Sequence, residues 1–314
     1  TEDPVVMSKE TATVAPRPLG PIRRTRIRPD SPAVPLPDMF RMETPAQIER
    51  SIQMYQRVLE RDPDYADAHF ALGYAYDKQG DLENALASYN QAVTLNPSSH
   101  DYLYLLGYVY ERKKELRQAI DLYEKASSIE PGDSDIAFSL GYVYEQTGQY
   151  TESIEAFSRA IEMKSDDYDA YYGLASVYEK SGRLQDALTS FQQVVTLKPD
   201  EEAPLRTLGA IALKMERWDD VIGAYETMVA RNPDDVDAHR ILANAYKKKG
   251  QEQKVIAAYK EIIRIDPSSS AAYTNLGNSY VRLKDYDNAV RRYQAGIEAD
   301  PNFVLRHGYT YSGH

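Results

Sequence analysis

Tyrosines and acidic residues recur in this chain at a fixed interval, in a combination that can bind cations. The motif GYVYE occurs at 107–111 and again at 141–145, and the related GYAYD occurs at 73–77, so that each copy begins 34 residues after the previous one. Tyrosine rings attract cations through their faces, and carboxylates pair with arginine or lysine. The repeated motif therefore predicts a surface for a positively charged partner.

No group of residues has the spacing of a catalytic or metal site. The chain has no phosphate-binding glycine loop, no HExxH motif and no nucleophile elbow, and it contains no cysteine. The histidines are scattered: we expect His69 and His239 in the core, His100 at the start of a helix, and His307 and His314 in a terminal tail. We therefore predict a protein that is not an enzyme and that needs neither a metal nor a cofactor.

Composition and charge restrict the partners that the chain can bind. Of its 314 residues 42% are hydrophobic and 27% are charged, and the formal net charge is −11. Because that charge would repel phosphates, nucleic-acid binding is not expected. No run of about 18 apolar residues is present, so direct membrane insertion is not expected. The start TEDPVV lacks a methionine. A processed N-terminus would slightly favour an exported protein, periplasmic or extracellular, over a cytoplasmic one, and a trimmed chain is the alternative.

The 34-residue interval divides much of the chain into seven equal units. They are 66–99, 100–133, 134–167, 168–201, 202–235, 236–269 and 270–303. With positions numbered 1 to 34 in each unit, position 7 is always Leu, position 8 is Gly or Ala, and position 24 is Tyr or Phe. Apolar residues at positions 4, 7, 8 and 11, and again at 20, 24, 27 and 28, predict two amphipathic helices in each unit, which we call helix A and helix B.

This pattern resembles the tetratricopeptide repeat (TPR), and the resemblance extends over all seven units. It implies an all-α fold, a right-handed superhelix (an α-solenoid) of antiparallel helix pairs that serves protein–protein interaction. Residues 46–65 resemble a lone helix B, so we predict a half-repeat there, one array over 46–303 and a short tail at 304–314. Gly at position 15 is expected to end helix A in four units. Lys114, Glu216 and Lys284 at that position predict somewhat different turns in the other three.

Helix A carries a second stripe, at positions 2, 5, 9, 12 and 13, that packing within a repeat does not require. In the TPR family this face lines a concave groove for partner peptides, so the resemblance implies a groove here. The first tyrosine of GYVYE is expected in the groove and the second in the core. The alternative is that the rings pack against neighbouring helices A. The expected groove residues are the rings Phe70, Tyr74, Tyr104, Tyr108, Phe138, Tyr142 and Tyr172 and the acids Asp77, Glu111, Glu145 and Glu179.

The position-12 acids favour cation binding because they lie near helix C-termini, where the helix dipole disfavours an acid. The last three repeats are basic on the same stripe instead. There the residues resemble the carboxylate-binding grooves of the family and indicate an anion or carboxylate site, with a solvated basic face as the alternative. The residues of this candidate anion site are Arg206, Arg240, Asn244, Lys248, Asn275 and Asn278.

Residues 1–45 differ in composition and hold nine of the 17 prolines. Such a segment favours extended or disordered chain, and 45 residues at about 3.1 Å each reach roughly 140 Å. The segment 17–29 contains Arg17, Arg23, Arg24, Arg26 and Arg28 and no acid. We expect this arm to lie in the groove of its own chain or of a neighbour, and a flexible linker is the alternative.

Taken together, the residues predict an adaptor or assembly scaffold whose aromatic and acidic groove binds an extended basic or proline-rich peptide. Its partners are expected to be proteins or peptides, and self-association is a further option. The alternative is a structural subunit of a larger complex or filament, held by arm exchange and end-to-end stacking of repeats. That alternative follows from the tail after the last repeat, which we expect to be too short for the capping helix that such arrays usually carry.

Overall fold

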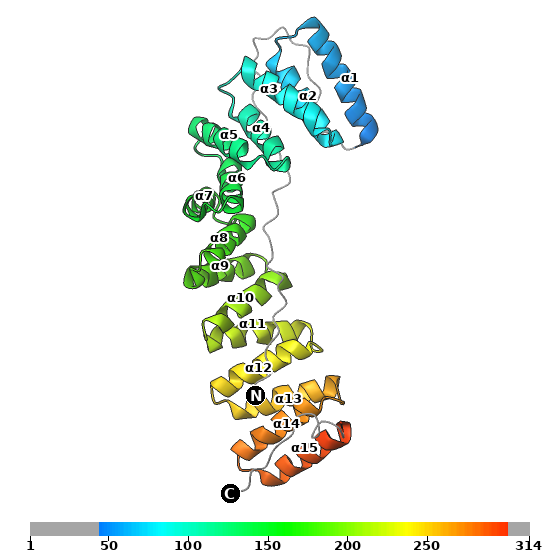
Figure 1. The fold of residues 1–314 in the computed structure, drawn as a ribbon, viewed down its shortest axis with the longest axis vertical. Coiled ribbons are helices and arrows are strands. Elements are labelled where there is room, and N and C mark those ends of the chain that lie inside the picture. The colour runs from blue at the N-terminus through cyan, green and yellow to red at the C-terminus, as the bar shows by residue number, and fades with distance from the viewer. Residues whose placement is uncertain (1–43, 301–314) are drawn as a thin grey trace. The chain divides into compact units, whose positions relative to one another are not determined.

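The computed structural model describes residues 44–300, and in this part of the chain every regular element is an α-helix (Figure 1). The predictions for the arm at 1–43 and for the tail from 301 onwards lie outside the described residues. Contacts divide the described chain into two compact units, 44–183 and 184–300. The division falls inside the fourth repeat, and each unit is described by itself, so the single array over 46–303 stays a prediction.

The first unit contains the half-repeat, the first three repeats and helix A of the fourth repeat. Its helices are α1 (Pro45–Arg61), α2 (Ala66–Gln79), α3 (Leu82–Leu95), α4 (His100–Arg112), α5 (Leu116–Ile129), α6 (Ser134–Gln146), α7 (Tyr150–Met163) and α8 (Tyr168–Lys180). Helix α1 packs against α2, as expected of a half-repeat. Thr44 caps α1 with its hydroxyl, while the Gln47 side chain returns to the Thr44 backbone, so the helix start is fixed locally.

The second unit continues the alternation of helices A and B. Its helices are α9 (Leu184–Leu197), α10 (Glu202–Lys214), α11 (Trp218–Arg231), α12 (Val236–Lys248), α13 (Glu252–Ile265), α14 (Ser270–Arg282) and α15 (Tyr286–Ala299). Each helix packs against the next along the chain within this unit. Across residues 44–300, none of the helices is both long and apolar enough to cross a membrane. The predicted all-α class and the helix pairs are confirmed.

Close approach of helix B to helix A explains the small residue at position 8. A Cβ added to Gly107 would lie 2.8 Å from the ring of Tyr123, and one added to Gly141 would lie 2.7 Å from the ring of Phe157. These distances are shorter than a carbon–carbon contact allows, so a side chain at position 8 would push the ring at position 24 away. The glycine and the ring therefore fit together as one packing unit.

The turn that ends helix A is the same with and without glycine at position 15. Gly80 has a φ of 87°, and Lys114, with a φ of 63°, occupies the same left-handed region. The next N–H donates to the position-11 carbonyl in both repeats, from Asp81 to Tyr76 and from Glu115 to Tyr110, at 2.9 Å. The prediction that Lys114, Glu216 and Lys284 form different turns is wrong, because this capping bond imposes the left-handed conformation whatever the residue.

Candidate binding face on the A helices

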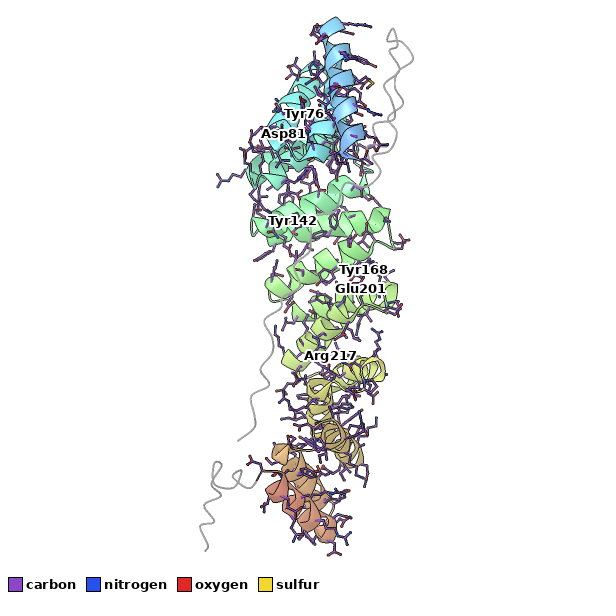
Figure 2. All side chains as sticks on the ribbon, turned by 90° about the vertical axis from the view of Figure 1, so that its right-hand side faces the viewer. Tyr76, Asp81, Tyr142, Tyr168, Glu201 and Arg217 are labelled. Atoms are coloured by element: carbon purple, nitrogen blue, oxygen red, sulfur yellow. The ribbon has the colours of Figure 1, made fainter. Side chains whose placement is uncertain are left out.

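All of the predicted groove residues lie on four A helices of the first unit, α2, α4, α6 and α8. We call the surface formed there by positions 5, 9, 12 and 13 the A-face. Tyr142, on α6, marks it in Figure 2. The groove residues were predicted at positions 5, 9 and 12, and at each of these positions some of the side chains are buried.

Position 5 belongs to the core. Phe138 is 1% exposed and packs edge-on against the Phe157 ring, with 5.5 Å between ring centroids. Phe70 is also buried, between Tyr89 of its own repeat and Tyr102 of the next. The expectation of free rings at Phe70 and Phe138 is wrong, because a ring at position 5 fills the space beside the ring at position 24.

Tyr104 shares this role, although it is only half-buried. Its ring lies 5.5 Å from that of Tyr123, and its hydroxyl lies 3.3 Å from the Ser139 hydroxyl on α6. Tyr172 is also half-buried on α8. The alternative reading of the sequence, in which rings pack between neighbouring helices A, is thus correct for most of position 5.

Both tyrosines of the second GYVYE motif, Tyr142 and Tyr144, are at least partly buried. Tyr142, at position 9, is 5% exposed, whereas Tyr144, at position 11, is half-buried and donates to Glu124 Oε1 on α5 at 2.5 Å. Tyr74 is buried like Tyr142, and only Tyr108 keeps a half-buried ring at position 9. The assignment of the first tyrosine to an open groove and the second to the core is therefore wrong, because the position-11 hydroxyl reaches the preceding helix B.

Two of the position-12 acids are already paired. Arg112 donates to Asp77, and Lys180 Nζ lies 3.0 Å from Glu145 Oε1. In both pairs the base stands at position 13 of the next repeat, 35 residues further on. Asp77 and Glu145 are buried, so the expectation that they are free to bind a peptide is wrong. Burial raises the pKa of Asp77, and Arg112 partly opposes that rise.

The cations also cover tyrosine rings of their own helices. Lys78 Nζ lies 5.3 Å from the centre of the Tyr74 ring, and the Arg112 guanidinium lies 5.8 Å from that of Tyr108. Each pair joins positions 9 and 13, one helical turn apart. The cation–π chemistry expected from a partner is therefore supplied within the chain in these two repeats.

Glu111 is the exception among the buried acids of the A-face. Its Oε2 accepts a hydrogen bond of 2.8 Å from the Tyr123 hydroxyl, and it is 4% exposed. Burial raises the pKa of Glu111 to about 7, while Tyr123 and Lys114 oppose the rise. The residue at position 13 of the next repeat is Gln146, which cannot neutralise it. Reading position 12 against position 13 of the following unit would have revealed this difference in the sequence.

The candidate anion site in the second unit has arginines that are paired with acids. Arg206 Nη2 lies 2.5 Å from Glu202 Oε1 and 3.3 Å from Asp235 Oδ2, and Arg240 Nη2 lies 2.6 Å from Asp237 Oδ1. The remaining members differ in their surroundings. Lys248 lies over the Trp218 ring, Asn278 accepts a hydrogen bond from Tyr293, and Asn244 and Asn275 are half-buried. The anion site stays a prediction. No group of residues within 44–300 is arranged to hold a metal.

Family models described as tetratricopeptide repeats match most of the chain. One matches 46–100, 77–135 and 138–202, and others match 179–245, 237–269 and 270–303. No curated protein matches the sequence.

Solved structures with the same fold include proteins of several kinds. MamA is 25% identical with a TM-score of 0.50, over 53% of this chain and 97% of its own. The C-terminal part of a TPR protein from Cytophaga hutchinsonii is 18% identical with a TM-score of 0.58, over 73% of this chain and 94% of its own. A chain of the Naa15/Naa10 complex bound to HypK-THB is 17% identical with a TM-score of 0.52, over 86% of this chain and 46% of its own.

Proposed function

Because the chain belongs to the tetratricopeptide-repeat family, we propose that it is an adaptor or assembly scaffold that holds an extended basic or proline-rich peptide on the A-face. The observation that carries this proposal is the distribution of charge. Residues 44–183 contain 24 acids and 13 Lys or Arg, so this unit alone has a net charge of −11, equal to that of the whole chain. A unit of this charge attracts basic segments and accelerates their association.

The A-face offers a smaller contact surface than the sequence predicts. Tyr108 on α4 and Tyr172 on α8 are half-buried, so part of each side chain remains at the surface, and Glu179 on α8 is half-buried as well. Half-buried aromatic rings give contact area at little entropic cost. We assign the contact with a peptide to these three residues and to the region around Glu111 and Tyr142.

The proposed occupant is the arginine-rich segment 17–29, RPLGPIRRTRIRP, from the same chain or from a neighbour. Five arginines and no acid complement the acidic unit. The three prolines of the segment favour extended conformations, so that less entropy is lost on binding. Recognition of this kind requires binding and no catalytic step.

The test is a titration of fluorescein-labelled peptide 17–29, followed by fluorescence anisotropy. The host is the full chain with Arg17→Gln, Arg23→Gln, Arg24→Gln, Arg26→Gln and Arg28→Gln, which we call the arm-neutral chain. These changes remove competition from the chain's own arm. We expect a Kd of about 100 μM or tighter that weakens with salt. A peptide with all five arginines replaced by glutamine is the control. No binding at about 1 mM would contradict the proposal.

A second candidate function is self-association through the last repeat. Five exposed large hydrophobic side chains lie on α14, on α15 or in the turn between them. They are Val281, Leu283, Tyr286, Val290 and Ile297. Helix α1, at the other end of the described residues 44–300, has no exposed large hydrophobic side chain. We propose that two copies cover these surfaces with each other, since α1 offers no exposed apolar counterpart for end-to-end stacking.

Light scattering over a range of concentrations tests this second candidate. We expect a dimer, and we expect Tyr286→Lys with Val290→Lys to convert it to a monomer. A matched control is Ala87→Lys with Gln91→Lys, which adds the same two charges at exposed positions one turn apart on α3 in the first unit. A wild-type monomer at all concentrations, or an open-ended oligomer, would count against a closed pair.

A further inference from the structure

At two of the three junctions between neighbouring A helices of the first unit, the position-12 acid pairs with the position-13 residue of the next repeat. Between α2 and α4, Arg112 bonds Asp77, and between α6 and α8, Lys180 bonds Glu145. In both junctions the acid is buried and the base reaches it from the solvent side. A cation of the next repeat therefore binds the position-12 carboxylate at the first and third junctions.

The middle junction, between α4 and α6, has no cation. Gln146 occupies position 13, and its amide nitrogen donates to Glu145 Oε2 at 3.5 Å rather than to Glu111. Within residues 44–300, no lysine, arginine or histidine forms an ion pair with Glu111, and Lys114 acts on it only at longer range. A buried carboxylate is therefore present at this junction without the partner that its two equivalents have.

Tyr142 lacks a cation at the same place. Arg112 covers Tyr108 in the preceding repeat, but the equivalent residue to cover Tyr142 is again Gln146. Among the described residues the Tyr142 hydroxyl has no hydrogen-bond partner. In the preceding repeat one cation, Arg112, contacts both the equivalent ring, Tyr108, and the equivalent acid, Asp77. Burial and the charges of Glu111 and Glu145 raise the pKa of Tyr142. The absence of one base thus leaves both the Glu111 carboxylate and the Tyr142 ring without a cation.

The burial of Glu111 does not prevent a long side chain from reaching it. The Asp77 side chain is 4% exposed while it binds Arg112, whose side chain is 34% exposed. The Glu145 side chain is fully buried while it binds Lys180, whose side chain is 36% exposed. Glu111, at 4%, is buried to a similar degree. A cation that enters from solvent can therefore bind it and keep about a third of its own surface exposed.

We propose that the junction of α4 and α6 is the anchor point for one arginine of the segment 17–29, whose guanidinium pairs with Glu111 and lies against Tyr142. This inference rests on the proposed function, because it names the point on the A-face at which that peptide is held. Arginine suits the site because its planar fork can bond a carboxylate and stack on a ring at once. Lysine could make only one of these contacts well.

The test uses the arm-neutral chain and labelled peptide 17–29, with changes at the junction. Glu111→Gln removes the charge, and Gln146→Arg supplies the missing base from within the chain. We expect each change to raise the Kd at least tenfold, since a charge-assisted contact is lost or blocked. The control is Gln118→Arg, which adds the same charge at an exposed position of α5 and should change the Kd less than threefold.

A double-mutant cycle then identifies the arginine. Five peptides, each with one of Arg17→Gln, Arg23→Gln, Arg24→Gln, Arg26→Gln and Arg28→Gln, are measured against the arm-neutral chain with and without Glu111→Gln. One peptide should bind the wild-type junction at least tenfold more weakly, and Glu111→Gln should then cause no further loss.

The outcomes separate this inference from the function on which it rests. If peptide 17–29 binds and neither Glu111→Gln nor Gln146→Arg changes its Kd, the anchor is wrong and the adaptor function stands. If the peptide does not bind the arm-neutral chain at all, both are wrong. Gln146→Arg should also raise the melting temperature, because it neutralises Glu111, so loss of binding in that variant cannot be ascribed to unfolding.

Discussion

The Tyr123 hydroxyl donates a 2.8 Å hydrogen bond to Glu111 Oε2, joining helix B to helix A inside one repeat. The equivalent contact is absent in the repeats on either side. Tyr89 is buried without a partner for its hydroxyl among the described residues, since Asp77 is shorter and bonds Arg112. The next repeat has Phe157 at this position, which has no hydroxyl. A position-12 acid thus bonds either a cation of the next repeat or a tyrosine of its own, and Glu111 has only the tyrosine.

The pH dependence of stability should report the buried charge of Glu111. Its pKa of about 7 in the folded protein exceeds the unfolded value of 4.5, so folding takes up a proton between these values. Stability is therefore lost as the pH rises from about 5 to 8. Glu111→Gln should be more stable than wild type by about 1–3 kcal/mol at pH 8.5 and equally stable near pH 4.5.

Urea unfolding followed by circular dichroism at both pH values measures this difference. The charged group that acts on Glu111 is Lys114, and the other neighbours are tyrosines of α4, α5 and α6, whose pKa values burial raises. These tyrosines are Tyr104, Tyr108, Tyr123 and Tyr142. Glu152→Gln, an exposed change on α7, is the matched control and should show no pH-dependent gain. A gain for Glu111→Gln that is equal at both pH values would contradict the assignment.

A methyl group at position 8 should separate helix A from helix B. Gly107→Ala would place a carbon 2.8 Å from the Tyr123 ring, and we expect it to lower the free energy of unfolding by about 1–3 kcal/mol. Gly223→Ala, in the interior of α11, meets nothing within 4 Å and should raise it by about 0.5–1 kcal/mol. Thermal and urea unfolding of the two variants compare them directly. Equal effects would mean that close packing does not select this glycine.

The fold could be predicted because the same pattern of packing residues recurs in all seven units. Position 8 is small wherever position 24 is a ring, and the structure places the two in contact, as at Gly141 and Phe157. Helix starts were also readable, since Ser99 and Asp133 cap α4 and α6 with their side chains. Local signals of this kind depend on neighbours within about 34 residues, so a single sequence contains them.

The exposure of the A-face could not be read in the same way. Whether a ring on helix A is open or covered depends on how closely the next repeat approaches, and periodicity does not give that distance. Phe138 and Tyr108 have equivalent aromatic character in the sequence, yet one is in the core and the other is half-buried. The ion pairs could have been predicted, because the two residues of each pair are 35 positions apart, as in Asp77 with Arg112 and Glu145 with Lys180. They appear only when charges are compared between successive repeats.

Left-handed residues other than glycine are sites for stabilisation. Glu216 has a φ of 54° and Lys284 a φ of 62°, a conformation in which the Cβ is unfavourable. Glu216→Gly and Lys284→Gly should each raise the free energy of unfolding by about 0.5–1 kcal/mol, the strain relieved being partly offset by the greater entropy of unfolded glycine. Gly80→Ala, at a φ of 87°, is the reciprocal control and should destabilise. Stabilisation by alanine at that position would contradict the argument.

The two kinds of A-face aromatic residue should respond differently to truncation. Phe138 is 1% exposed against the Phe157 ring, so Phe138→Ala leaves a cavity and should lower the free energy of unfolding by about 3–5 kcal/mol. Tyr108 keeps part of its ring at the surface, and Tyr108→Ala should cost only about 1–2 kcal/mol, because solvent can occupy much of the space. Melting temperature and urea midpoint, measured on both variants with helicity as the check on folding, distinguish the cases. Equal losses would place Tyr108 in the core with Phe138 and remove it from the peptide-binding surface.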